Sequence, residues 1–215
     1  METVTQPGQI VILNGAPRAG KSSIVAAIQE TFDGVWMNLG VDVFMRDVMP
    51  PQYRPGIGLR PGGERPDLEP LIEVLYAALY ESIAAHSRLG LDVVVDVGHH
   101  DAYSRPRHML AGCARRLAGL PVLFIGVRCP LDVIIQRRDA GQAGREHMYA
   151  RGTAADPVPE PVRRWQREVH RPGIYDLEVD TSKLTPAECA AAIREWLRAG
   201  PAPSAFARIA GVRVV

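Results

Sequence analysis

The chain has 215 residues, a formal net charge of +1, 47% hydrophobic residues and 23% charged residues. These values are typical of a globular protein with an ordinary core, and they exclude the strongly basic surface of a nucleic-acid-binding protein. The three cysteines have no CxxC spacing, so neither a disulfide framework nor a zinc site is expected. No apolar run reaches membrane-spanning length and there is no signal-type segment, so we expect a cytoplasmic protein without a membrane partner.

Five short apolar segments alternate with helical patterns along the chain. Consecutive apolar residues are typical of parallel strands that helices cover on both faces. The predicted strands are Gln9–Asn14, Val35–Val41, Leu91–Val97, Pro121–Arg128 and Ile174–Val179. The sequence therefore predicts an α/β fold with a parallel sheet.

Two helices have clear signals. Between the second and third predicted strands, apolar residues at helical spacing form one stripe: Leu68, Leu71, Ile72, Leu75, Leu79 and Ile83. Asp67 is the expected N-cap of this helix, and Pro70 falls in its first turn. Further along, Thr185 and Glu188 have the spacing of a capping box, and that helix should end before Gly200.

Three segments have irregular patterns. Residues 50–66 are rich in Pro and Gly, which predicts a long loop with a functional or mobile character. Residues of about 140–161 are expected to form a lid. The main domain is expected to span residues 1–200, followed by a tail at 201–215. This tail is either loosely ordered or an added element whose Val212–Val215 end pairs with another part of the chain.

The segment from Gly15 to Ser22 matches the phosphate-loop pattern G-x-x-x-x-G-K-[ST]. Its glycines allow a tight turn in which backbone N–H groups surround phosphates, and the N-terminus of the next helix adds positive potential. Lys21 would bridge the β- and γ-phosphates of ATP, and the Ser22 hydroxyl would bind Mg²⁺. The strand–loop–helix context favours this interpretation over a chance Gly/Pro turn. The predicted nucleotide-binding residues are Gly15, Ala16, Pro17, Arg18, Ala19, Gly20, Lys21, Ser22 and Ser23.

Two acidic residues follow predicted strands, at the edge of a parallel sheet where ligands bind. Asp96 lies near the end of the third strand and is expected to hold Mg²⁺ as the acid of a Walker B strand does; the alternative is a helix or turn cap. Asp42 follows the second strand and is a candidate general base for a hydroxyl acceptor. An N-cap for residues 43–49 explains Asp42 equally well on spacing alone.

Further polar residues lie in the loop after the third predicted strand and in the segments after the fourth. His99 and His100 are expected to form a solvated pair in preference to contacting substrate or a transition metal. Arg138 and Arg145 are expected to neutralise the charge of a transferring phosphoryl group, with a surface charge as the alternative. Arg137 is expected to point to solvent. Solvated or helix-pairing side chains are also expected at Arg151, Arg163 and Arg164.

Together these residues resemble the chloramphenicol phosphotransferase family, small kinases that phosphorylate a hydroxyl of that antibiotic. The matching segments are IVILNGAPRAGKSSIV, LGVD, VVVDV, VLFIGVRC and YDLEVDTS followed by ECAAAI, in the order of the family. The pairing of GVD with GVRC is more specific than the phosphate loop. The chain departs from the family at Val97, where the family has a second acid, and at Gln142, where it has a lid arginine.

The resemblance implies a three-layer P-loop fold of the nucleoside-kinase type, with a five-stranded parallel sheet in the order 2-3-1-4-5, helices on both faces and a lid. It makes Asp42 the preferred catalytic base. Segment 180–182 falls where such kinases contact adenine. The family's catalytic positions match Asp42, Lys21, Arg138 and Arg145, and its metal positions match Ser22 and Asp96.

We therefore expect a small-molecule kinase that uses ATP and Mg²⁺ to phosphorylate a hydroxyl of chloramphenicol or another antibiotic. The alternatives are a kinase for a nucleoside or other metabolite, and a nucleotide-binding switch or binding module with little catalytic activity. The partner expected is the small-molecule acceptor alone, with no nucleic acid. Its pocket is expected to be lined by residues after the second strand, by the 50–66 loop and by the 68–88 helix. The sequence predicts no oligomeric state, because the apolar stripes are already needed for the core.

Overall fold

The computed structural model describes residues 6–53, 60–140 and 158–211. Its strands form one parallel sheet in the order β2-β3-β1-β4-β5, which confirms the predicted order. The strands are β1 (Ile10–Asn14), β2 (Trp36–Asn38), β3 (Asp92–Val97), β4 (Val122–Arg128) and β5 (Leu177–Asp180). Since all five run the same way, their carboxyl ends meet at one edge of the sheet.

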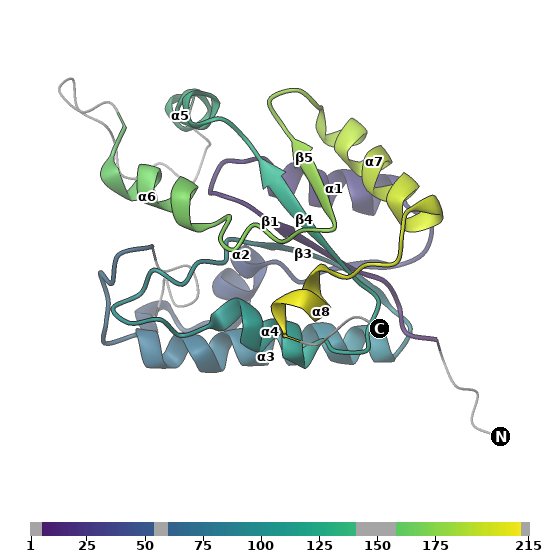
Figure 1. Ribbon diagram of the computed structural model, residues 1–215, viewed down its shortest axis with the longest axis horizontal. Helices are drawn as coiled ribbons and strands as arrows, with labels where there is room; N and C mark the ends of the chain where they lie inside the picture. The colour runs from purple at the N-terminus through teal and green to yellow at the C-terminus, as the bar shows by residue number, and fades with distance from the viewer. Residues whose placement is uncertain (1–5, 54–59, 141–157, 212–215) are drawn as a thin grey trace.

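Helices cover both faces of this sheet (Figure 1). The helices are α1 (Lys21–Thr31), α2 (Val41–Val43), α3 (Glu69–Arg88), α4 (Met109–Arg116), α5 (Leu131–Asp139), α6 (Glu160–Glu168), α7 (Pro186–Ala199) and α8 (Ala205–Ile209), with a π-helical turn η1 (Phe44–Val48) and a 3₁₀ turn η2 (Pro51–Tyr53). One core cluster lies under α3, α4 and α8, and the other lies under α1 and α7 with contributions from α5 and α6. No helix of the described segments combines the length and apolar character needed to cross a bilayer.

The central strand β1 contributes side chains to both core clusters. Ile10 and Ile12 belong to the cluster on the α3 side, and Val11 and Leu13 belong to the cluster on the α1 side. All four side chains are fully buried. This arrangement explains why the segment reads as a continuous apolar run, since helices remove both faces of the strand from water.

Three predicted boundaries are wrong. The fifth strand was expected to begin at Ile174, but β5 begins at Leu177. The second strand was expected over residues 35–41, but it ends at Asn38, whose side-chain Oδ1 accepts the N–H of Gly40 (3.0 Å) and turns the chain into α2. Asp67 is not the N-cap of α3: that position is Leu68, and the Asp67 carboxylate accepts two hydrogen bonds from Arg65 instead. Pro70 in the first turn is confirmed, as are the capping box of α7 and its end before Gly200.

Helix α8 lies within the segment predicted as a tail, and it packs into the core. Ala205 and Phe206 are buried, and the Phe206 ring lies 4.9 Å from that of Phe124 and 6.5 Å from that of Tyr80, centre to centre. The N–H groups of Ser204 and Ala205 donate to one carboxylate oxygen of Asp176. A boundary at residue 200 stays a prediction, and Val212–Val215 lie outside the described residues.

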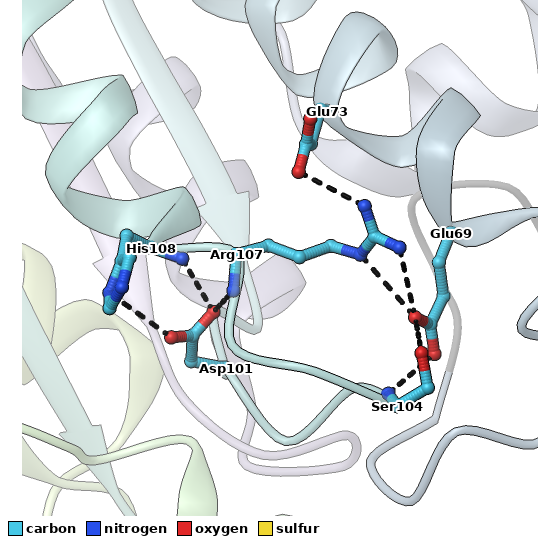
Figure 2. A network of polar contacts seen from close by, with 6 residues as sticks. All are labelled: Glu69, Glu73, Asp101, Ser104, Arg107 and His108. Atoms are coloured by element: carbon cyan, nitrogen blue, oxygen red, sulfur yellow. Dashed lines mark hydrogen bonds and ion pairs between the residues drawn. The ribbon is translucent and has the colours of Figure 1, made fainter.

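A buried polar network ties the loop after β3 to the start of α3 (Figure 2). Arg107 donates to Glu69 and to Glu73, and both the N–H and the hydroxyl of Ser104 donate to Glu69. The side chain of Glu69 is fully buried and that of Arg107 is 5% exposed. Burial opposes ionisation of Glu69, but the bonds from Ser104 and Arg107 outweigh it and hold its pKa below the ordinary value. The Ala102 carbonyl of this loop also accepts the N–H of Gly62 (2.7 Å). This bond attaches part of the 50–66 segment to the loop after β3.

Replacing Arg107 with Ala should lower the free energy of unfolding by about 3–5 kcal/mol, because Glu69 is then a buried carboxylate without its cation. Urea unfolding of the two proteins measures the difference. The control is Arg116→Ala, which removes an exposed ion pair with Glu81 and should cost at most about 1 kcal/mol. Equal effects of the two substitutions would contradict the importance of the buried pair.

Candidate active site

The phosphate loop connects β1 to α1 at the carboxyl edge of the sheet (Figure 1). Gly15 must be glycine, because a Cβ there would lie 2.5 Å from the Val127 carbonyl oxygen of the neighbouring strand. Gly20 is the N-cap of α1 with φ +90°, a conformation that glycine adopts without strain. Arg18 is also left-handed, with φ +70°. The loop thus has the tight, irregular backbone that phosphate binding requires.

Lys21 is the first residue of α1 and folds back over the loop. Its ammonium donates to the carbonyls of Gly15 (2.7 Å) and Ala16 (3.0 Å). Burial lowers the pKa of Lys21, and the negative charges of Asp96 and Asp42 act in the opposite direction. The lysine therefore contacts the loop and is attracted by two carboxylates, one near the end of β3 and one in α2.

Ser22 and Asp96 are in direct contact. The Ser22 hydroxyl donates to Oδ2 of Asp96 at 2.9 Å, and the carboxylate is only 8% exposed. A hydroxyl and a carboxylate oxygen are the hard ligands that Mg²⁺ prefers, and this ion usually takes one or two protein ligands together with phosphate oxygens and water. In the described residues no three His, Cys, Asp or Glu side chains gather into a metal cage. The pair thus fits an ion that a nucleotide helps to hold.

Asp42 lies in the first turn of α2, directly after β2, and it is half-buried. The N-cap of α2 is Gly40, so the alternative of Asp42 as an N-cap is wrong. The residue lines the same cavity as Lys21 and Asp96. Three side chains that are far apart in the sequence thus converge because β1, β2 and β3 end at one edge.

A single cavity of about 810 Å³ joins these groups. Its lining includes the phosphate loop together with Arg137, Arg138 and Thr181. It also includes a set of mostly apolar and aromatic residues with one cation: Val41, Met45, Arg60, Tyr76 and Trp165. The cavity thus has room for a nucleotide and a second small molecule of drug-like size.

Arg137 does not point to solvent, contrary to expectation. Its guanidinium donates to the Thr181 carbonyl (2.7 Å) and hydroxyl (3.0 Å), and to the Arg18 carbonyl (3.4 Å). The Thr181 hydroxyl in turn donates to the carbonyl of Ala19 (2.8 Å). The loop after β5 and helix α5 are thereby fastened to the phosphate loop. The sequence did not indicate these contacts of Arg137. Arg137 and Arg138 are adjacent in the chain, and only the direction of each side chain distinguishes them.

The other predicted arginines have different outcomes. Arg138 lines the cavity, whereas Arg145 and Arg151, like Gln142 and most of the predicted lid, lie outside the described residues. Arg164 pairs with Glu160 one helical turn earlier (3.8 Å), as the helix-pairing interpretation predicts. In the 180–182 segment, Thr181 is the residue that reaches the cavity.

His99 and His100 are buried, so the prediction of a solvated pair is wrong. His99 Nε2 hydrogen-bonds the Tyr80 hydroxyl (2.6 Å), and burial lowers the pKa of His99 to about 3, which keeps the ring neutral. The His100 ring packs against those of Tyr103 and Trp165. Neither histidine lines the cavity. They lie outside the cavity, and His100 packs against Trp165, which forms part of the cavity wall.

Sequence reasoning missed Trp165 and Gln166 as cavity residues. It anticipated Arg60 and Tyr76 only through their segments, the 50–66 loop and the 68–88 helix, which were expected to line the acceptor pocket. Tyr76 had a usable signal, since it lies four residues from both Ile72 and Tyr80 on the buried face of α3. Trp165 and Gln166 come from α6, a short helix whose charged sequence gave no indication of a buried face. Their places depend on the packing of α6 against the carboxyl edge.

Comparisons with known proteins agree with this geometry. The sequence model of the family described as chloramphenicol phosphotransferase-like protein matches residues 8–198. A protein of Mycobacterium tuberculosis H37Rv named Putative O-phosphotransferase Rv2636 is 27% identical over 216 residues, covering 94% of this chain and 88% of that protein.

Two solved structures share the fold. The M. tuberculosis APS kinase CysC in complex with AMPPNP and APS superposes with a TM-score of 0.58 at 17% identity, covering 90% of this chain and 99% of the other. An unliganded sugar kinase from Janibacter sp. HTCC2649 gives a TM-score of 0.58 at 18% identity, covering 90% and 97%. At these identities the likeness concerns the fold alone.

The sheet order and the phosphate loop define a P-loop kinase of small molecules. More particularly, the chain belongs to the chloramphenicol phosphotransferase-like family, whose model covers most of its length. The resemblance read from the GVD and GVRC segments is thereby confirmed.

Replacing Arg137 with Gln should weaken ATP binding by about tenfold. A net hydrogen bond contributes about 1 kcal/mol, and the guanidinium makes several to the loops that border the phosphates. Isothermal calorimetry measures the affinity. Arg115→Gln, which changes an exposed arginine of α4, is the matched control. A lower melting temperature with unchanged ATP affinity would show that Arg137 matters for folding alone.

Proposed function

We propose that this protein transfers the γ-phosphoryl group of ATP to a hydroxyl of a small molecule in a Mg²⁺-dependent reaction. The observation that carries the proposal is the convergence of Lys21, the Ser22–Asp96 pair and Asp42 on one cavity at the carboxyl edge of the sheet. This is where ligands bind in open α/β sheets. A cytoplasmic location, where ATP is available, belongs to the same proposal.

The nucleotide half of the site would work through the phosphate loop. Backbone N–H groups of this loop would surround the phosphates, and Lys21 would bridge the β- and γ-phosphates. Ser22 would hold Mg²⁺ directly and Asp96 would hold it through water. Bound there, the ion neutralises charge on the β- and γ-oxygens. Arg138 lines the cavity and would add positive charge; the same role for Arg145 stays a prediction from sequence.

Asp42 would act as the general base. Its carboxylate accepts the proton of the acceptor hydroxyl while the hydroxyl oxygen forms a bond to the γ-phosphorus and the bond to the β-γ bridging oxygen breaks. ADP leaves with that oxygen. A nucleotide-dependent switch or binding module, the alternative class, has no use for a carboxylate at this point of the cavity, so the position of Asp42 favours an enzyme.

For the acceptor, we propose chloramphenicol or another hydroxylated antibiotic. Family membership supports this choice, and so do the apolar and aromatic walls that Val41, Met45, Tyr76 and Trp165 provide. Aromatic side chains offer large contact areas to rings of a drug-sized molecule. A nucleoside or another metabolite is the alternative acceptor.

An ADP-release assay with Mg²⁺ and ATP tests the proposal. Chloramphenicol, other hydroxylated antibiotics, nucleosides and sugars are supplied as acceptors, and we expect chloramphenicol or a related antibiotic to stimulate release. Stimulation by a nucleoside or sugar alone would contradict the antibiotic and keep the kinase. Silence with every acceptor, while ATP still binds, would favour the switch.

Replacing Asp42 with Asn should reduce turnover by about 10²-fold or more, the scale of general-base catalysis, because the amide cannot accept the proton. The affinity for ATP should stay nearly unchanged. Steady-state kinetics and calorimetry measure the two quantities. The control is Asp47→Asn on η1, which removes an exposed carboxylate paired with Arg46 and should keep full turnover. Undiminished turnover of Asp42→Asn would rule out the base assignment.

A further inference from the structure

Gly40 occupies an unusual place between the two halves of the site. It follows β2 by two residues, is buried, and precedes α2, in which Asp42 lies. Its N–H is held by the side chain of Asn38, and the preceding N–H, of Leu39, donates to the Val94 carbonyl of β3 (3.1 Å). These bonds fix the backbone of residue 40 against the end of β3.

The backbone conformation does not explain the glycine. Gly40 has φ −63° and ψ 157°, a region that every amino acid adopts readily. Any requirement for glycine at position 40 must therefore come from the space that its missing side chain leaves.

That space is filled by the carboxylate of Asp96. A Cβ at position 40 would lie 1.8 Å from Oδ1 of Asp96 and 3.1 Å from its Cγ. The other oxygen, Oδ2, accepts the Ser22 hydroxyl. The carboxylate is thus held between a hydrogen-bond donor on α1 and the bare Cα of Gly40. A Cβ at this position would force the Asp96 carboxylate to move, and because its other oxygen accepts the Ser22 hydroxyl, that movement would disturb the contact with Ser22.

We infer that Gly40 is a positioning residue for the metal-binding carboxylate: its lack of a side chain keeps Asp96 beside Ser22 in the orientation that Mg²⁺-nucleotide binding requires. This inference rests on the proposed function, and it assigns Gly40 a role in the site.

The test is a calorimetric titration with ATP, once with Mg²⁺ and once with EDTA and no metal, on the whole chain and without any acceptor. Gly40→Ala should weaken binding of Mg²⁺-ATP by about 10-fold or more, the usual cost of disturbing a group that orients a metal ligand. Binding of metal-free ATP should change by less than about twofold, since the phosphate loop and Lys21 are untouched.

Two further variants make the test specific. Gly112→Ala in α4 is the matched control, because a Cβ there meets its nearest neighbour, Nη2 of Arg115, at an ordinary 3.9 Å. It should bind both forms of ATP as the parent chain does. In a chain that already carries Asp96→Ala, adding Gly40→Ala should cause no further loss, because the clashing carboxylate is gone.

The outcomes separate this inference from the proposed function. If ATP affinity of the parent chain responds to Mg²⁺ and Gly40→Ala responds equally, the inference is wrong and the kinase proposal stands. Additive losses in the double variant would also overturn it, since the effect would then not pass through Asp96. An ATP affinity of the parent chain that ignores Mg²⁺ would overturn both.

Discussion

The hydrogen bond from Ser22 to Asp96 is the contact on which the arrangement of the site depends. It joins the first turn of α1 to the end of β3, and therefore joins the phosphate loop to the strand beside it. Register makes this possible, because β1 and β3 pair so that Leu13 lies beside Asp96, one residue before β1 ends. Two further groups of the site act on the same carboxylate: its charge opposes the lowering of the Lys21 pKa by burial, and Gly40 leaves the space that it fills.

Most of the fold could be predicted because it follows from local patterns. Strands buried on both faces read as apolar runs, and the capping box of α7 is a short-range signal that packing did not override. Two of the misses occurred where a side-chain hydrogen bond to a near neighbour decided the boundary. Asn38 ended β2 early by accepting the N–H of Gly40, and Arg65 bound the Asp67 carboxylate just before the start of α3. Neither choice is visible in propensity or periodicity.

The residues of the candidate site also differ in whether local sequence patterns could predict them. The phosphate loop and its serine were readable because one contiguous motif contains them, and Asp42 and Asp96 were readable because acids at the carboxyl ends of parallel strands must lie near one another. The direction in which Arg137 faces and the burial of His99 and His100 were not readable, since each depends on contacts with Thr181, Tyr80 or Trp165 from other elements. The residues contributed by α6 were missed for the same reason.

The position of α8 has a consequence for how the chain is made. A ribosome delivers β1, α3, β3 and β4 in turn, long before residues 205–209 emerge, and domains generally fold as units during synthesis. Until Phe206 arrives, the aromatic surface formed by Tyr80 and Phe124 lacks its cover. The nascent protein therefore exposes this aromatic surface from the synthesis of β4 until α8 emerges, and α8 then covers one side of the sheet. A chain that stopped before α8 would be prone to aggregation even though its phosphate loop is complete.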